Sequence, residues 1–285
     1  MRPLRAPAKV NLTLEILGRR PDGYHGLRSV AVPVGIYDEI RIEENAGALA
    51  FSCDNEQIDP DNNLVVKALR ALALAQYDFT IFLKKRIPVG AGLGGGSSDA
   101  AAVLLAAMNG ELGRAGRRDY LAIAQELGSD VAFFLSQTAA IMEGAGERVT
   151  PLGAIPTWGC TVVKPPSAIA TATAYSELSV RRESRPRASS ATIQLGEALQ
   201  RGDLRRVQAL AQNDFESWAA SKYADVQTAL NALHEWNGFS QLSGSGSAVY
   251  TIYEEMPTAP LRLPSGFQRF DTTFVSTPVW RTPNA

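Results

Sequence analysis

The chain has 285 residues, a formal net charge of −1, two cysteines and two histidines. This length is enough to bury one large or two medium cores. The balanced charge argues against a nucleic acid as the main partner, and two histidines exclude a metal site built from several of them. Cys53 and Cys160 lie far apart without metal-site spacing, which is typical of a reducing cytosol. With no signal segment and no apolar run of about 20 residues, we expect a soluble cytoplasmic protein without a membrane partner.

The first predicted element is a strand over residues 6–17, where apolar and polar side chains alternate. Its polar face carries Lys9, Asn11, Thr13 and Glu15. Most such faces are simply solvated, which is the plainer interpretation. Because Lys9 and Asn11 lie side by side shortly before a turn, the alternative is that both belong to a site.

Residues 18–23 have the composition of a turn, and Tyr24 and His25 follow directly. A tyrosine beside a histidine at a loop tip can stack on a base and hydrogen-bond its edge, or can simply cover the turn. Further strands are predicted over 27–34, 38–53 (with a turn at 45–47) and 79–83. Between the last two, apolar side chains at helical spacing predict a helix to about residue 76, which Asn62 or Asn63 can cap.

Residues 86–109 are the most informative stretch. Five glycines crowd into seven positions: Gly90, Gly92, Gly94, Gly95 and Gly96. Such density is costly unless the backbone adopts positive φ or a neighbour approaches closely. Ser97, Ser98 and Asp99 then offer N-cap side chains to an alanine- and leucine-rich helix that runs to about Met108. A loop ending on a helix N-terminus presents unpaired N–H groups and a positive dipole end, which predicts an anion site, above all for phosphate.

Three known glycine motifs do not fit this loop. The P-loop requires a lysine after its last glycine, and none follows Gly96. Residues 90–95 match the dinucleotide pattern G-x-G-x-x-G, but Pro88 and a basic run precede them and Glu111 lies in a glycine-rich turn. The protein-kinase V-A-I-K and H-R-D motifs are absent. A glycine-rich linker would explain the glycines but neither the hydroxyl side chains nor the abrupt helix.

The next segment is predicted to contain a second helix start with a carboxylate. Asp119 caps a helix to residue 127 that Gly128 can end, and Asp130 stands as an N-cap before the apolar run 131–135. Later predicted elements are a strand over 139–143, a turn at 144–146, a strand over 161–163, a helix over 171–178 carrying Tyr175, a polar linker over 181–190, and helices over 193–200, 203–219 and 225–236. Proline-containing residues 151–158 mark a boundary, which predicts domains 1–156 and 157–285.

The loop P-V-G-A-G-L-G-G-G-S-S-D-A resembles the phosphate loop of the GHMP small-molecule kinases. Other blocks that resemble this family stand in order around it: A-P-A-K-V-N-L, D-G-Y-H-G-L, N-N-L-V-V-K-A, L-G-S-D-V-A-F-F and S-G-S-G-S-A-V-Y. The resemblance therefore spans residues 6–253. The D-G-Y-H block is similar to the branch that phosphorylates 4-diphosphocytidyl-2-C-methyl-D-erythritol.

This resemblance implies an α+β fold of two domains, the first like ribosomal protein S5 domain 2 and the second a ferredoxin-like sandwich, with the active site between them. It implies ATP and Mg²⁺ as cofactors and phosphorylation of the 2-hydroxyl of the cytidylated alcohol in the non-mevalonate isoprenoid pathway. The rivals are a GHMP kinase of homoserine or mevalonate type and a non-catalytic nucleotide or metabolite sensor. The oligomeric state, monomer or homodimer, stays open.

The resemblance also implies roles for individual residues. Asp130 would accept the substrate proton, Lys9 would hold Asp130 and stabilise charge, and Asn11 would position the substrate. Tyr24 and Tyr175 would stack on cytosine while His25 bonds its polar edge. The residues implied to bind ATP are Pro88, Gly90, Gly92, Leu93, Gly94, Gly95, Gly96, Ser97 and Ser98, with Asn63 either near the adenine or only a helix cap.

Two features remain open in this comparison. The family pattern L-G-A-D-V-P-F-F differs here at Ser129 and Ala132, and the missing proline loosens the turn that places Asp130. The protein ligands of the metal are not identified by the sequence, and Ser98 is one candidate.

Overall fold

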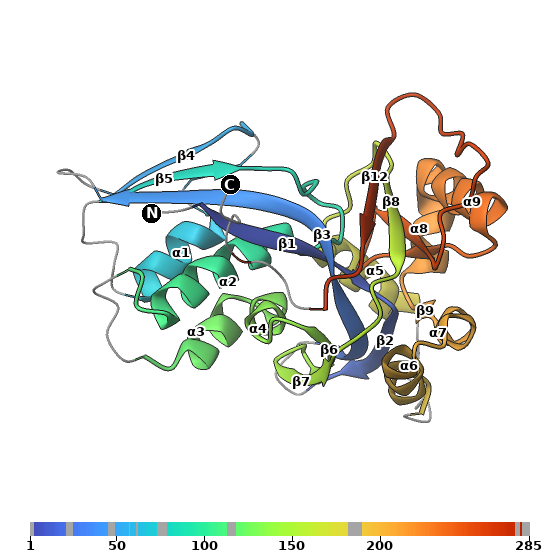
Figure 1. The fold of residues 1–285 in the computed structure, drawn as a ribbon, viewed down its shortest axis with the longest axis horizontal. Helices are drawn as coiled ribbons and strands as arrows, with labels where there is room; N and C mark the ends of the chain where they lie inside the picture. The colour runs from blue at the N-terminus through green and yellow to red at the C-terminus, as the bar shows by residue number, and fades with distance from the viewer. Residues whose placement is uncertain are drawn as a thin grey trace.

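The computed structural model describes residues 3–20, 25–44, 49–56, 58–60, 62–72, 79–112, 118–181, 190–276 and 280. Tyr24, the turn predicted at 45–47 and most of the polar linker predicted at 181–190 lie outside these residues. Within them the chain forms two β-sheets, each with its own helices (Figure 1).

The larger sheet is organised by strand β3 (His25–Glu44), which is 20 residues long. Antiparallel partners lie along it: β1 (Leu4–Asn11), β2 (Thr13–Arg19), β5 (Phe79–Lys84) and β6 (Ala139–Gly144). The sheet is completed by β4 (Ala50–Cys53) on β5, β7 (Arg148–Gly153) on β6, and the two-residue β9 (Gln212–Asn213) parallel to β2. Because valine and isoleucine occupy most of the buried positions of β3, one strand can serve as the common support for the others.

Four helices pack together against this sheet: α1 (Leu64–Ala71), α2 (Gly95–Met108), α3 (Tyr120–Leu127) and α4 (Ser129–Leu135). Figure 1 shows them on one side of β1, β3 and β5. Helix α2 is apolar all round, and its residues 98–107 are buried because it contacts β1 and the other three helices. Its alanines allow this close approach on every side, which fixes the position of the helix start.

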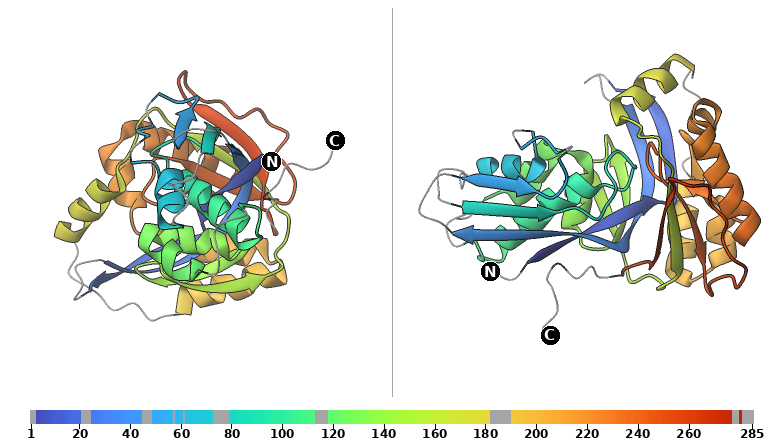
Figure 2. Two further views of the ribbon diagram at one scale, coloured as in Figure 1. Left: turned by 90° about the vertical axis from the view of Figure 1, so that its left-hand side faces the viewer. Right: turned by 90° about the horizontal axis from the view of Figure 1, so that it is seen from above.

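The smaller sheet is antiparallel, in the order β10 (Gln241–Leu242), β11 (Val249–Tyr253), β8 (Gly159–Lys164) and β12 (Gln268–Thr273). The helices beside it are α5 (Thr171–Arg181), α7 (Leu204–Leu210), α8 (Glu216–Lys222) and α9 (Ala224–Asn237). Helix α6 (Ser190–Arg201) instead packs on α7 and on β3, β6 and β7 of the larger sheet. The view from above in Figure 2 shows this part of the chain beside the end of the long strand β3. One apolar cluster contains Val10 of β1 as well as Val162 and Tyr250 of the smaller sheet. The core is therefore continuous between the two sheets, and the boundary near residue 157 stays a prediction.

Several predicted elements were wrong in extent. The strands predicted separately over 27–34 and from residue 38 are one continuous strand, β3, because β1 pairs with it on both sides of residues 35–36. The helix predicted to about residue 76 ends at Ala71, with Leu72 as its C-cap. The strand predicted over 6–17 is two strands, because the chain changes partners on β3 at Leu12. The helix predicted over 203–219 is interrupted by β9, where Gln212 and Asn213 pair with β2. The side chain of Asn213 also donates hydrogen bonds to the carbonyls of Leu242 and Gly244, both at 2.8 Å. These tertiary bonds outweigh the local helix propensity of the segment.

Of the two interpretations of the polar face of the first strands, the solvated one was wrong. Lys9, Asn11, Thr13 and Glu15 are all at most 3% exposed, so the face is not solvated. Thr192 of α6 hydrogen-bonds both Thr13 and Glu15 and helps to cover the face. No helix in the described part of the chain is long and apolar enough to cross a membrane.

Candidate active site

A cleft of about 680 Å³ opens over the start of α2. Its walls come from β1, the loop after β5, α4, α5 and the loop before β11. It is lined by most of the residues singled out from the sequence: Lys9, Asn11, His25, Asn63, Pro88, Gly90, Gly92, Leu93, Gly94, Gly95, Gly96, Ser97, Asp130 and Tyr175. Ser98 is the exception among the described residues, because it is buried below the cleft. Residues from both predicted domains therefore meet in one cavity.

The glycine loop is clamped between β1 and the small-residue loop at 243–247. Its Leu93 carbonyl accepts a hydrogen bond from the Lys9 amide (3.0 Å), and its Gly92 carbonyl accepts one from Ser243 Oγ (3.0 Å). Gly92 and Gly94 both have φ of +73°, which side-chain-bearing residues rarely adopt. A Cβ on Gly92 would lie 2.1 Å from the Ser243 carbonyl oxygen. The prediction of positive φ and close approach is thus confirmed at this position.

The predicted N-caps of α2 were wrong. The helix begins at Gly95 with Gly94 as N-cap, and no side chain caps it. Ser97, Ser98 and Asp99 lie inside the first turns instead. The amides of residues 95–97 consequently lack intrahelical partners, and no cap side chain competes for them. These amides and the positive helix end form the anion-binding surface of the cleft.

Opposite this helix start, Lys9 and Asp130 face each other. The Lys9 Nζ lies 3.6 Å from Asp130 Oδ2 and donates hydrogen bonds to Asn11 Oδ1 (2.6 Å) and to the Gly92 carbonyl (2.9 Å). Asn11 in turn donates to Ser29 Oγ at 2.8 Å. The lysine side chain is 4% exposed whereas that of Asp130 is 32% exposed. The ammonium is therefore held rigidly from behind, while the carboxylate remains open to the cleft.

Asp130 is not the N-cap that the sequence predicted. Gly128 occupies that position and Asp130 lies in the first turn of α4. Ser129, one of the departures from the family pattern, donates from Oγ to the Ala145 carbonyl at 2.5 Å. Ala132, the other departure, is 2% exposed within the core. A side-chain tether and tight packing thus hold the start of α4 where the pattern has a proline.

Aromatic side chains form one wall of the cleft. The rings of His25 and Tyr175 stack with centroids 5.3 Å apart, and Tyr175 meets the buried ring of Phe215 edge-on at 4.8 Å. Burial raises the pKa of Tyr175, and the nearby Asp130 carboxylate adds to the shift. The sequence pointed to His25 and Tyr175, whereas Phe215 was missed because it reads as an ordinary core residue.

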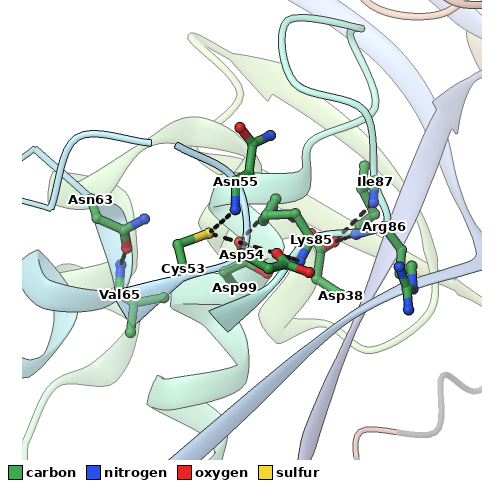
Figure 3. Close-up of polar contacts among 10 residues, drawn as sticks. All are labelled: Asp38, Cys53, Asp54, Asn55, Asn63, Val65, Lys85, Arg86, Ile87 and Asp99. Atoms are coloured by element: carbon green, nitrogen blue, oxygen red, sulfur yellow. Dashed lines mark hydrogen bonds and ion pairs between the residues drawn. The ribbon is translucent and has the colours of Figure 1, made fainter. Parts of the chain in front are cut away.

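Asn63 caps α1, since its side-chain oxygen accepts a hydrogen bond from the Val65 amide at 2.7 Å (Figure 3). The capping interpretation is therefore confirmed for this asparagine rather than for Asn62. Asn63 also lines the cleft, so the adenine interpretation stays open beside it.

Beneath the loop lies an ion cluster that sequence reasoning missed. Lys85 Nζ contacts Asp38 Oδ2 at 2.5 Å and Asp99 Oδ2 at 2.8 Å. Burial alone would lower the pKa of Lys85, but the Asp99 and Asp38 carboxylates outweigh it and raise the pKa. Burial, opposed by Lys85 and assisted by Asp38, raises the pKa of Asp99 from 3.8 to about 8. The available signal was the position of Asp38, which alternates with Ile36, Ile40 and Ile42 on the buried face of β3.

No group of three or more histidine, cysteine, aspartate or glutamate side chains that could hold a metal ion occurs among the described residues. Ser98 Oγ, however, is buried and has no hydrogen-bond partner in the described part of the chain. Mg²⁺ commonly takes one or two protein oxygens and completes its shell with phosphates and water. An orphaned hydroxyl in the first turns of α2 fits that donor set.

The chain belongs to the GHMP kinase family. The model of the family's N-terminal domain matches residues 63–138, and that of its C-terminal domain matches residues 196–260. A relative from Chloroherpeton thalassium, named 4-diphosphocytidyl-2-C-methyl-D-erythritol kinase, is 37% identical over 259 residues, which cover 88% of this chain and 89% of that protein. A protein of the same name from Pseudothermotoga lettingae is 34% identical over 87% of this chain and 90% of its own length.

The fold agrees with this assignment. A crystal structure of 4-(cytidine 5'-diphospho)-2C-methyl-D-erythritol kinase superimposes with a TM-score of 0.76 at 31% identity, covering 95% of this chain and 98% of the other. A homoserine kinase from Cytophaga hutchinsonii gives a TM-score of 0.66 at 17% identity, covering 97% and 96% of the two chains. That second likeness shows the fold alone. The predicted two-domain α+β kinase fold is confirmed.

Proposed function

We propose that this protein transfers the γ-phosphoryl group of ATP to the 2-hydroxyl of 4-diphosphocytidyl-2-C-methyl-D-erythritol. The observation that carries the proposal is the arrangement of the cleft. The Lys9–Asp130 pair lies in the same cavity as the N-terminus of α2, which has free amides suited to phosphate, and as an aromatic wall. The relatives at 37% and 34% identity bear the name of this kinase. Together they support one reaction and one class of substrate.

The nucleotide phosphates would bind at the start of α2. The free amides of residues 95–97 donate to phosphate oxygens, and the positive helix end favours their charge. Gly94 stands where a Cβ would meet the Phe134 ring at 3.0 Å and the Lys9 side chain at 3.1 Å, so the loop passes directly over the lysine. The phosphates are thereby brought next to the Lys9 ammonium. Asn63, which also lines the cleft, would contact the base of the nucleotide.

The proposed chemistry uses Asp130 and Lys9. Phosphoryl transfer depends mostly on positioning and charge stabilisation rather than on covalent work by the protein. Asp130 accepts the proton of the attacking hydroxyl, since its carboxylate is the open member of the pair. Lys9, fixed by Asn11 and Gly92, holds the carboxylate in place and stabilises negative charge on the transferred group.

Mg²⁺ would neutralise charge on the β- and γ-phosphates. Ser98, whose unpartnered hydroxyl lies buried below the cleft, is the candidate protein ligand. The cytidine would lie against Tyr175 and His25 at the aromatic wall. Stacking on an aromatic ring suits any base, and a histidine nitrogen can hydrogen-bond its polar edge. Tyr24, outside the described residues, stays a prediction as the second stacking ring.

The test is ADP release from ATP and Mg²⁺ with the cytidylated alcohol, beside methylerythritol phosphate, mevalonate and homoserine. We expect turnover with the cytidylated alcohol alone. Asp130→Asn should abolish turnover yet bind ATP nearly as well as the wild type, because it removes the proton acceptor and leaves the phosphate loop intact. Turnover with another alcohol would refute the proposed substrate, and a fully active Asp130→Asn variant would refute the proposed base.

A further inference from the structure

A buried ion cluster lies directly under the phosphate loop, outside the groups used for the transfer itself. It consists of Asp38 from β3, Lys85 after β5 and Asp99 from α2, and Figure 3 shows the three side chains converging. Their side chains are 0%, 7% and 2% exposed. Three ionisable side chains have thus been removed from water at one point where a strand, a loop and a helix meet.

The cluster holds the beginning of the loop through its backbone. Asp38 Oδ1 accepts hydrogen bonds from the amides of Arg86 (2.5 Å) and Ile87 (2.8 Å), while its other oxygen binds Lys85 Nζ. The amide of Lys85 itself donates to Asp54 Oδ1 at 2.7 Å. Three consecutive amides before Pro88 therefore donate hydrogen bonds to carboxylates, which leaves this segment little freedom to move.

The same cluster holds the end of the loop. Lys85 Nζ binds Asp99 Oδ2, and Asp99 lies one turn beyond Gly95, where α2 begins. A Cβ on Gly95 would be only 3.2 Å from the Lys85 Nζ, so the ammonium lies against the first residue of the helix. Both ends of the glycine loop are consequently tied to one lysine.

Stability alone is a poor explanation for this arrangement. Desolvating several charges costs about as much as their attraction returns, and well-packed apolar residues often serve as well or better. What the ion cluster supplies instead is a defined direction and distance between the two loop ends, since each contact is a hydrogen bond with fixed geometry. That is the property needed where amides must point at a ligand to within a fraction of an ångström.

We propose that Asp38, Lys85 and Asp99 are positioning residues that set the glycine loop and the start of α2 for the nucleotide phosphates. The proposal rests on the proposed function only in taking the ligand to be a nucleoside triphosphate. Breaking the cluster should weaken recognition of the phosphates and leave recognition of the base and sugar intact.

The test compares Lys85→Met with Lys84→Met, its neighbour on β5 whose side chain is exposed. Binding of a non-hydrolysable ATP analogue (AMPPNP) and of adenosine is measured by calorimetry, together with urea unfolding. We expect Lys85→Met to weaken AMPPNP binding by about tenfold with adenosine binding unchanged. Lys84→Met should change neither. If Lys85 had a purely structural role, its substitution would instead lower the fraction of protein able to bind and would reduce the affinity for both ligands equally.

If Lys85→Met does not fold, Asp99→Asn carries the test, because the amide keeps the shape and an acceptor oxygen. Asp99→Asn is expected to reduce the affinity for AMPPNP by less than Lys85→Met does and to leave the affinity for adenosine unchanged. Equal losses for both ligands, or unchanged AMPPNP affinity in a folded Lys85→Met variant, would overturn the proposal. A selective loss of AMPPNP binding in a protein that never phosphorylates the cytidylated alcohol would refute the proposed substrate and support the positioning proposal.

Discussion

Gly92→Ala is the substitution whose effect the structure determines most directly. Gly92 has φ of +73°, and an added Cβ would lie 2.1 Å from the Ser243 carbonyl oxygen and 3.0 Å from the Gly246 amide nitrogen. Both neighbours are backbone atoms of the loop before β11, so neither can rotate away. The methyl group can be accommodated only if the two loops separate.

The cost has two parts. A left-handed conformation costs an alanine about 1–2 kcal/mol, and forcing an extra carbon into a packed site about 1–3 kcal/mol more, so we expect a loss of about 2–5 kcal/mol in the free energy of unfolding. Gly110→Ala is the matched control, because Gly110 has φ of +74° with nothing within 4 Å of the added Cβ. The Gly110→Ala variant should lose only the cost of the left-handed conformation, about 1–2 kcal/mol in the free energy of unfolding.

Urea unfolding followed by circular dichroism measures both losses, and ADP release measures the consequence for catalysis. The Gly92 carbonyl accepts a hydrogen bond from Lys9 Nζ, so loop separation also displaces the lysine. Displacement of about 1 Å in a catalytic group can cost about 100-fold in rate, which we expect for Gly92→Ala and not for Gly110→Ala. Equal destabilisation of the two variants would refute the contact argument, and near-normal activity in Gly92→Ala would refute the link to Lys9.

Two further predictions follow from the aromatic wall and the ion cluster. Tyr175→Ala removes the ring stacked on His25 and should weaken binding of the cytidylated substrate by about 1–3 kcal/mol without affecting AMPPNP; unchanged substrate affinity in calorimetry would contradict stacking. Because the folded protein raises the pKa of Asp99 from 3.8 to about 8, this group stabilises the fold at low pH and loses that contribution as pH rises through this window. Urea unfolding in chelator-containing buffer measures this. Between about pH 5 and pH 8 the free energy of unfolding of the wild type should fall, relative to that of Asp99→Asn, by up to about 1.4 kcal/mol per pH unit. The same dependence of unfolding free energy on pH in both proteins would contradict the prediction.

Local signals predicted the parts of the fold that local chemistry determines. Helix α3 begins after Asp119, whose side chain accepts a hydrogen bond from the Ala122 amide, and ends at Gly128 as expected. The glycine loop and the helix after it were likewise readable. Strand β12 was not predicted, because it is an edge strand without regular apolar alternation and is defined by its pairing with β8. Its existence depends on a partner more than 100 residues earlier in the chain.

The cap errors at α2 and α4 have a common physical cause. Serine and aspartate are good caps in isolation, but at both sites the preceding glycine takes the capping position. At α2 this leaves the amides of residues 95–97 free, and at α4 it leaves the Asp130 carboxylate in the first turn, facing Lys9. A side chain that capped its own helix would be unavailable to a ligand. Local propensity therefore misleads at the positions where a site requires unpaired groups.

The buried polar face of β1 and β2 shows the remaining limit of sequence reasoning. Alternation predicted that Lys9, Asn11, Thr13 and Glu15 share one face. In the structure Lys9 bonds Asn11, and Thr192 bonds both Thr13 and Glu15. Thr192 and Gln212 cover this face, because each donates a hydrogen bond to one carboxylate oxygen of Glu15. Because these partners lie 177 and 197 residues from Glu15 in the chain, no local pattern could reveal the burial. Yet the burial is what lets Asn11 hold the Lys9 ammonium away from water, where its charge acts most strongly on a bound phosphate.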